Sequence, residues 1–184
     1  MKKHAILLAL LLILILPCRS RAIGQAIDRA KVSLEHIWNL DDVYPSDEAW
    51  ARAKEKVAGQ FDKILVFKGT LSTSPGKLLA CLKLDSQIGK EIARLYTYAS
   101  MKSDQDTRQS KYQGMKQMMR QLVTDYQSKA SFIAPEIVAM DEADVNDFIQ
   151  REAGLKIYKM YLGDLLRTKA HRLSANGEKL LAEA

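Results

Sequence analysis

The stretch that decides the fold is Arg94-Leu-Tyr-Thr-Tyr-Ala-Ser-Met-Lys-Ser-Asp-Gln-Asp-Thr-Arg108. Its first half continues an apolar spacing of three and four residues, which is typical of an amphipathic helix. The polar side chains from Ser103 to Thr107 then offer acceptors for the exposed N–H groups of a turn. The stretch therefore predicts two long helices, the first ending near Met101 and the second beginning between Thr107 and Ser110.

The two helices around this turn carry apolar stripes. The first is expected to begin at Ser74-Pro75, because serine is a favoured N-cap and proline fits the first helical position. Its stripe consists of Leu84, Ile88, Ile92, Leu95 and Ala99, and the stripe of the second helix consists of Tyr112, Met115, Met119, Leu122, Tyr126 and Ile133. A methionine-rich stripe can form an adaptable binding surface, but the helical spacing favours a place in the core. Pro135 is expected to kink or end the second helix.

Shorter helices are predicted before and after this pair. Ser46 is a favoured N-cap, and Asp47 and Glu48 follow it in the first turn, where they complement the positive end of the helix dipole. Three further helices are expected to begin near Asp141, Leu155 and Ser174. No segment alternates apolar and polar residues at a period of two. The fold class is therefore all-α, a multi-helix region with no significant sheet.

The segment before these helices combines a targeting signal with a loop. Residues 1–24 are expected to be a signal peptide, because Lys2 and Lys3 precede an unbroken apolar run over residues 5–16 and small residues follow at positions 22–26. The protein is then exported to the periplasm or the cell exterior. An uncleaved N-terminus, or a lipid on Cys18, is the alternative. Residues 25–45 form a lead-in and a loop with two large anchors, Trp38 and Tyr44.

The net charge of +6 does not point to nucleic acid. Lys2, Lys3, Arg19 and Arg21 supply four of these positive charges, and all four lie in the predicted signal segment. The remaining charges alternate in sign, as they do on solvated helix faces. A nucleic-acid-binding protein concentrates its basic residues in a patch. We therefore expect no nucleic-acid partner, and contact with a membrane only through the signal segment.

The sequence contains no recognisable set of catalytic or metal-binding residues. Its three histidines are His4, His36 and His171, and no H-E-x-x-H spacing places two of them on one helix face. Asp41 and Asp42 have no neighbours that complete a metal site, so turn chemistry and capping are expected of them. We therefore assign no catalytic, cofactor-binding or metal-binding residue in this chain.

The cysteine that remains after signal cleavage is Cys81. It lies in an apolar helical context, where a buried and inert thiol is expected. A single cysteine cannot close a disulfide within the chain.

Several stretches resemble the N-terminal region of oligoendopeptidase F, a family of zinc metallopeptidases that cleave short peptides. The resemblance rests first on the opening stretch and on Trp38-Asn-Leu-Asp-Asp-Val-Tyr-Pro-Ser-Asp-Glu-Ala-Trp50. Four shorter runs are also similar and occur in the family's order: 67–71, 131–137, 171–174 and 178–182. The sequence departs from the family at Ser110, where relatives often have proline, and at Asn176-Gly177, where acids are common.

This resemblance implies an all-helical fold that forms part of the wall of a peptide channel. It also implies that the zinc ligands and the catalytic glutamate lie downstream, so the cofactor is zinc in the parent family and none in this chain. Residues 46–184 are then the helical N-terminal region, and the sequence ends inside a predicted helix before the catalytic domain. Oligopeptide substrates would be bound through that missing domain.

Two functions remain open at the level of sequence. The first is the N-terminal portion of an exported oligoendopeptidase F-like enzyme that is inactive by itself. The second is a stand-alone exported helical module that binds peptides or a partner protein without catalysis. The first function predicts a strongly helical but loosely packed chain, because the downstream half that should cover some of its apolar stripes is absent. A chain that melts cooperatively as a monomer would favour the second.

Overall fold

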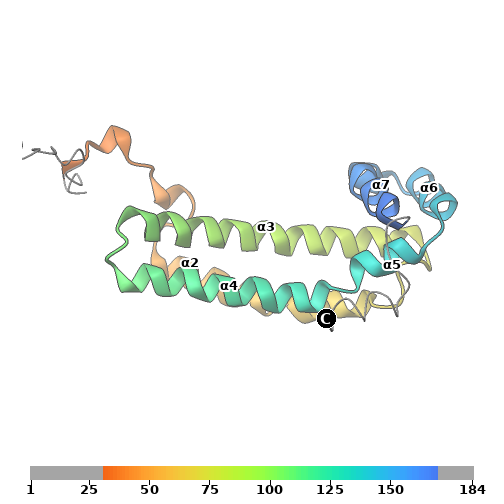
Figure 1. Cartoon of the computed structure of the whole chain (residues 1–184), viewed down its shortest axis with the longest axis horizontal. Coiled ribbons are helices and arrows are strands. Elements are labelled where there is room, and N and C mark those ends of the chain that lie inside the picture. Colours follow the sequence, from red (N-terminus) through yellow and green to blue (C-terminus); the bar gives the residue numbers. More distant parts are fainter. Residues whose placement is uncertain (1–30, 170–184) are drawn as a thin grey trace, which may run out of the picture. The chain divides into compact units, whose positions relative to one another are not determined.

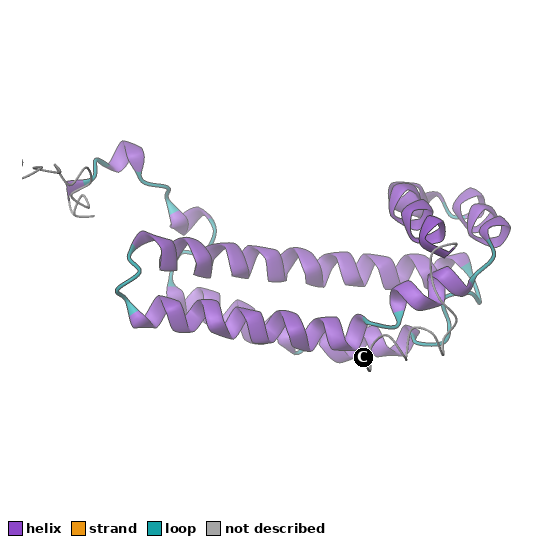
Figure 2. Cartoon of the chain, in the orientation of Figure 1, coloured by secondary structure: helices purple, strands orange, loops and turns teal. Residues whose placement is uncertain are grey.

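The computed structural model describes residues 31–169. The chain divides after Trp38 into two units, and the described part of the first unit contains one short 3₁₀ helix, η2 (Leu34–His36). All other described elements belong to the second unit, which begins at Asn39 and opens with a short 3₁₀ helix, η3 (Leu40–Asp42). Within residues 31–169 every regular element is a helix, which confirms the predicted all-α class (Figure 2). The predicted signal peptide, Cys18 and the helix expected from Ser174 lie outside the described residues.

Two long helices, α3 (Pro75–Gln105) and α4 (Ser110–Ala130), run side by side in opposite directions (Figure 1). The predicted start of α3 is confirmed, because the Ser74 hydroxyl accepts a hydrogen bond from the Lys77 backbone N–H at 3.3 Å. The predicted end at Met101 is wrong, since α3 continues for one more turn. Ser103 is buried in that turn, so packing overrides the preference of serine and aspartate for a loop.

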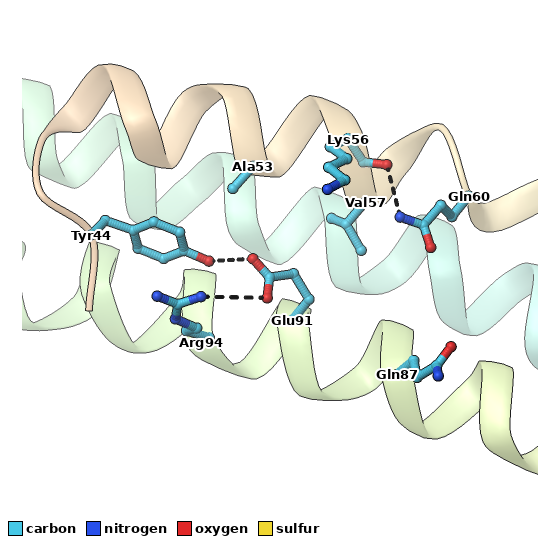
Figure 3. Close-up of a pocket in the computed structure, with 8 residues that line it drawn as sticks. All are labelled: Tyr44, Ala53, Lys56, Val57, Gln60, Gln87, Glu91 and Arg94. Carbon is cyan, nitrogen blue, oxygen red and sulfur yellow. Dashed lines mark hydrogen bonds and ion pairs between the residues drawn. The ribbon is translucent and has the colours of Figure 1, made fainter. Parts of the chain in front are cut away.

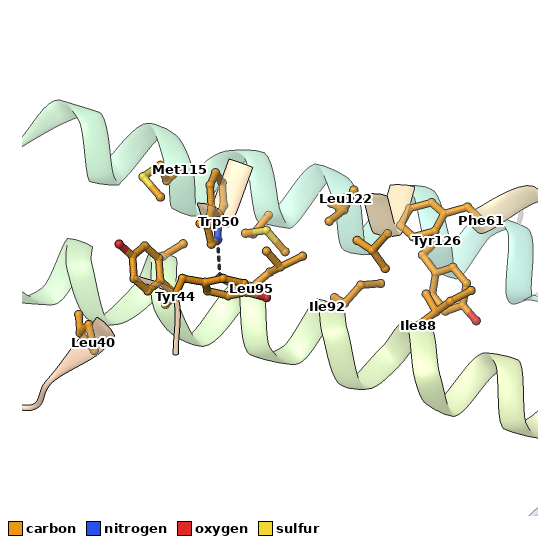
Figure 4. Close-up of a cluster of buried hydrophobic side chains, with 14 residues drawn as sticks. Leu40, Tyr44, Trp50, Phe61, Ile88, Ile92, Leu95, Met115, Leu122 and Tyr126 are labelled. Atoms are coloured by element: carbon orange, nitrogen blue, oxygen red, sulfur yellow. Dashed lines mark hydrogen bonds between the residues drawn. The ribbon is translucent and has the colours of Figure 1, made fainter. Parts of the chain in front are cut away.

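A shorter helix, α2 (Asp47–Ala58), packs against α3 and leads into the 3₁₀ helix η4 (Phe61–Phe67). Its predicted N-cap is confirmed, because the Ser46 hydroxyl accepts a hydrogen bond from the Ala49 backbone N–H at 3.2 Å. The three helices enclose a first core (Figure 4). That core includes Trp50, Val57, Phe61, Ile88, Ile92, Leu95, Met115, Met119, Leu122 and Tyr126. The methionine stripe is therefore part of the core, as the helical spacing predicts.

A second core lies where the start of α3 meets the C-terminal helices. These are α5 (Ile133–Ala139), α6 (Glu142–Arg151), the 3₁₀ helix η5 (Ala153–Tyr158) and α7 (Lys159–Thr168). Its buried members include Leu78, Leu82, Phe132, Ile137, Val145, Phe148, Leu155 and Leu162. Gly154 allows a close approach to Leu79, because a Cβ there would lie 2.6 Å from Leu79 Cδ2. The single helix predicted from Leu155 is in fact two elements, the 3₁₀ helix η5 and the α-helix α7.

Two expectations from the sequence are wrong in detail. Pro135 does not end α4, which already stops at Ala130. It lies instead in the first turn of α5, where a missing backbone N–H is tolerated. Trp38 is not an anchor, since its side chain is 76% exposed, whereas Tyr44 is only 4% exposed and packs in the first core.

Some large apolar side chains remain on the surface. Ile157 and Met160 are each 77% exposed, and Val66 is 71% exposed. Tyr161 is 40% exposed, so Ile157, Met160 and Tyr161 form a set of exposed apolar residues spaced three and four positions apart. Within residues 31–169, no helix combines the length and apolar character needed to cross a bilayer.

Candidate functional site

The residues that sequence reasoning weighed for metal chemistry are not brought together. Within residues 31–169, no group of three or more histidine, cysteine, aspartate or glutamate side chains is placed to hold a metal ion. His36 lies on the surface, with its Nε2 atom 3.6 Å from Glu35. Asp42 accepts a hydrogen bond from the Asn39 amide at 3.1 Å, which is the turn chemistry expected of this loop. His171 lies outside the described residues.

Cys81 is the buried thiol that the sequence predicts. Burial, with smaller contributions from the negative charges of Asp85 and Glu136, raises the pKa of the Cys81 thiol to about 12. The thiolate is the nucleophilic form of cysteine. A thiol with so high a pKa is therefore protonated at neutral pH and is not a nucleophile.

A groove between α2 and α3 is the candidate binding site (Figure 3). It has a volume of about 360 Å³. Its walls come from both helices, from the loop before α2 and from the turn after it: Tyr44, Ala53, Lys56, Val57, Gln60, Gln87, Glu91 and Arg94. Ala53 and Val57 supply an apolar base, and the other six residues supply polar groups.

One end of the groove is held by a connected polar network. The Tyr44 hydroxyl donates a hydrogen bond to Glu91 Oε1 at 2.5 Å. The Arg94 guanidinium lies 4.6 Å from the centre of the Tyr44 ring and donates a hydrogen bond to the Val43 carbonyl at 2.5 Å. The polar groups of Tyr44, Glu91 and Arg94 are therefore already engaged with groups of the protein at this end of the groove.

The other end of the groove carries polar groups that are less engaged. In the described part of the chain, no carboxylate pairs with the Lys56 ammonium, and no hydrogen bond involves the Gln87 side chain. The Gln60 amide donates a weak bond to the Lys56 carbonyl at 3.4 Å, which leaves its oxygen available. One cation and two amides are thus open to a ligand here.

Sequence reasoning missed this groove. Its residues come from positions 44–60 and 87–94, and they match no short motif. Lysine and glutamine at these spacings also occur on ordinary solvated helix faces. The only available signal was that Tyr44 would be an anchor, which marks one end of the groove.

Three tyrosine–carboxylate hydrogen bonds fix the helices around the groove. Besides the Tyr44–Glu91 bond, Tyr98 donates to Asp47 at 2.8 Å and Tyr126 donates to Asp85 at 2.6 Å. Burial first, and then the bond to the carboxylate, raises the pKa of Tyr44, Tyr98 and Tyr126 above the usual tyrosine value. These hydroxyls therefore stay protonated and act as donors.

Asp47 links the three α-helices of the first core, α2, α3 and α4. Its carboxylate accepts from Tyr98 on α3 and from the Lys111 ammonium on α4, the latter at 2.6 Å. Partial burial acts to raise the pKa of Asp47, but the hydrogen bonds from Lys111 and Tyr98 outweigh it and hold the pKa below its usual value. The ionised carboxylate thus stabilises the fold.

Replacing Asp47 with asparagine is expected to lower the free energy of unfolding at pH 7 by about 1–3 kcal/mol, the range for a hydrogen bond to a charged group. Because the folded pKa of Asp47 is lowered, its contribution is present above the unfolded value of about 3.9 and is lost as the pH falls through the folded pKa. Urea unfolding at several pH values measures this difference.

The matched control is Asp104→Asn. Asp104 also pairs with a lysine, Lys116 at 3.4 Å, but its side chain is 68% exposed, so the change is expected to stay within about 0.5 kcal/mol. If D47N and D104N unfold alike at pH 7, or if the D47N effect persists unchanged in acid, the assignment of Asp47 is wrong.

Comparison with known proteins places this helical region in a family. A profile described as oligopeptidase F matches residues 136–184. The chain is 36% identical to oligopeptidase PepF of Bacillus subtilis (strain 168) over 161 residues, which cover 88% of this chain. It is 30% identical over 157 residues to the group B oligopeptidase PepB of Streptococcus agalactiae serotype III (strain NEM316), covering 85% of this chain. The chain is related to the N-terminal region of oligopeptidase F.

Solved structures agree with this relationship. A crystal structure of oligoendopeptidase-F from Enterococcus faecium matches 74% of this chain with a TM-score of 0.65 and 26% identity. A protein described as a peptidase from Chlamydophila abortus shares the fold over 84% of this chain, with a TM-score of 0.73 and 21% identity. The chain spans about a quarter of the length of these proteins, 24% of PepF and 26% and 27% of the two crystal structures.

Proposed function

We propose that this chain forms the N-terminal helical region of an exported oligoendopeptidase F-like zinc metalloendopeptidase that hydrolyses short peptides. The observation that carries the proposal is the 36% identity to oligopeptidase PepF along 88% of the chain. The helices α2–α7 would form part of the wall of the peptide channel. The reaction itself would take place in polypeptide that corresponds to the rest of the relatives' length.

Residues 31–169 do not provide a site for a catalytic zinc ion. Such a site needs about three protein ligands and an open position. The sequence has three histidines and no H-E-x-x-H, and the described residues contain no cluster of suitable donors. No step of peptide hydrolysis is therefore derived from side chains of this chain.

Export is part of the same proposal. Its support is the pair Lys2 and Lys3 followed by the apolar run of residues 5–16, a pattern typical of signal peptides. A mature N-terminus near residues 22–26 is expected for the secreted form. N-terminal sequencing of the protein recovered outside the cytoplasm would check this cleavage.

The experiment that tests the peptidase proposal is to sequence the source gene beyond the codon for Ala184. We expect a reading frame that continues the similarity to oligopeptidase PepF and encodes an H-E-x-x-H motif, because two histidines one helical turn apart can bind one zinc ion. A downstream region that encodes no such motif in any nearby frame would contradict the proposal.

A second candidate is a helical module that binds peptides without catalysis. The specific observation in its favour is the groove between α2 and α3, which is formed entirely within this chain and has unengaged polar groups at one end. This candidate predicts binding by the isolated chain, whereas a channel wall alone does not.

A further inference from the structure

The unengaged end of the groove between α2 and α3 favours a negatively charged ligand. The lining carries two cations, Lys56 and Arg94, and one anion, Glu91. Glu91 accepts a hydrogen bond from Tyr44 and lies 3.9 Å from Arg94, so the one anion of the lining has a cation beside it. Lys56 has no such partner among the described residues. The open end therefore presents an uncompensated ammonium group.

The neighbours of Lys56 suit a peptide. Each glutamine amide carries donors and an acceptor, and so does each peptide unit. Gln60, in the turn between α2 and η4, and Gln87 on α3 offer this chemistry on opposite walls of the groove. The base beneath them is formed by Ala53 and Val57, and Val57 is only 2% exposed, so the polar groups supply most of the surface that a ligand can contact.

A phosphate group fits this end less well than a carboxylate. Arginine recognises phosphate through its planar fork of donors. The Arg94 fork is already bound to the Val43 carbonyl and lies against the Tyr44 ring. That leaves one lysine ammonium as the uncommitted cation of the lining, and a carboxylate with a single negative charge matches it. The groove volume of about 360 Å³ is near the lower end of ligand pockets, roughly 300–1,000 Å³, which suits the end of a short peptide.

We propose that the groove between α2 and α3 binds a carboxylate of a short peptide, with the Lys56 ammonium pairing with the carboxylate and Gln60 and Gln87 bonding to the adjoining peptide group. The carboxylate comes either from the peptide C-terminus or from an acidic side chain. This site does not depend on the proposed peptidase role, because all of its groups belong to this chain. The gene-sequencing test and the binding test can therefore fail separately.

The test is fluorescence anisotropy with the 184-residue chain and three dye-labelled pentapeptides of glycine, alanine and leucine. The first has a free C-terminal carboxylate, the second is its C-terminal amide, and the third is the amide with glutamate in place of leucine. We expect the first to bind at least about tenfold more tightly than the neutral amide, since one charge-assisted hydrogen bond supplies that ratio. If the third peptide binds as tightly as the first, the site accepts carboxylates generally. If the third peptide binds no more tightly than the neutral amide, the site is specific for the C-terminal carboxylate.

Three variants locate the binding in the groove. Lys56→Gln is expected to weaken binding of the free-carboxylate peptide about tenfold by removing the cation. Gln87→Glu places a negative charge on the opposite wall and is expected to abolish binding. Lys63→Gln makes the same charge change as K56Q at an exposed position of η4 outside the groove lining. This variant is expected to bind the peptide as the unchanged chain does.

Two results would overturn the proposal. One is equal binding of the neutral amide and the free-carboxylate peptide, which includes no binding of either. The other is equal binding by K56Q and K63Q. Lys56 and Gln87 are both exposed, so the substitutions are not expected to disturb the fold, and circular dichroism melting of each variant checks this.

Discussion

Replacing Trp50 with alanine is expected to lower the free energy of unfolding by about 3–5 kcal/mol, the usual range when a buried aromatic residue is removed. Trp50 is 2% exposed and lies in the first core between α2, α3 and α4. Its indole N–H also donates a hydrogen bond to the Leu95 carbonyl at 2.9 Å. Domains of this kind are stable by about 5–15 kcal/mol in total. The variant should therefore unfold at a much lower urea concentration.

The chain provides a matched control in its other tryptophan. Trp38 is 76% exposed, so Trp38→Ala should change the free energy of unfolding by less than about 0.5 kcal/mol. Trp50→Phe keeps a ring in the core and loses the indole donor, so a smaller cost of about 1 kcal/mol is expected from the hydrogen bond. Urea unfolding followed by circular dichroism ranks the three variants. Equal midpoints for W50A and W38A would show that the first core does not carry the stability of the fold.

Peptide hydrolysis by the purified 184-residue chain is expected to be absent, even with added zinc. The chain supplies no set of about three ligands for a catalytic metal ion among its described residues, and its sequence has no H-E-x-x-H. Without such a site there is no activated water molecule to attack a peptide bond. A quenched fluorescent peptide, incubated with the chain and zinc, measures this directly.

The appropriate control is oligopeptidase PepF of Bacillus subtilis, which is about four times as long as the matched region, assayed beside this chain. Zinc-dependent cleavage that remains after purification to homogeneity and stops on addition of a chelator would falsify the prediction. A weak activity that separates from the chain during purification would instead identify a contaminating peptidase and leave the prediction standing.

Local signals made much of the fold predictable. Ser46 and Ser74 both cap the helices expected of them, and α4 begins at Ser110 as the opening stretch predicts. These features depend on residues within four positions of each other. The errors arise where distant contacts decide the outcome. Burial of Ser103 extends α3 through residues whose own preference is for a turn.

The candidate site was less predictable than the fold. The groove is lined by residues from positions 44–60 and 87–94, which are far apart in the sequence, and no local pattern indicates that they meet. The tyrosine–carboxylate bonds pair residues 41 to 51 positions apart. Tyrosine and aspartate on a helix face are equally compatible with solvent exposure. The family resemblance correctly identified this part of the chain as an oligoendopeptidase F N-terminal region, but it assigned no functional residue within it.

The same three bonds limit how this region can vary in length during evolution. Asp85, Glu91 and Tyr98 all lie on α3, and their partners lie on α4, in the loop before α2 and on α2. One codon inserted between Asp85 and Tyr98 would rotate the following residues by about 100° around the helix axis. The bonds on one side of the insertion would then be lost together. Insertions and deletions in related genes should therefore collect in the connection at residues 106–109 and avoid the middle of α3.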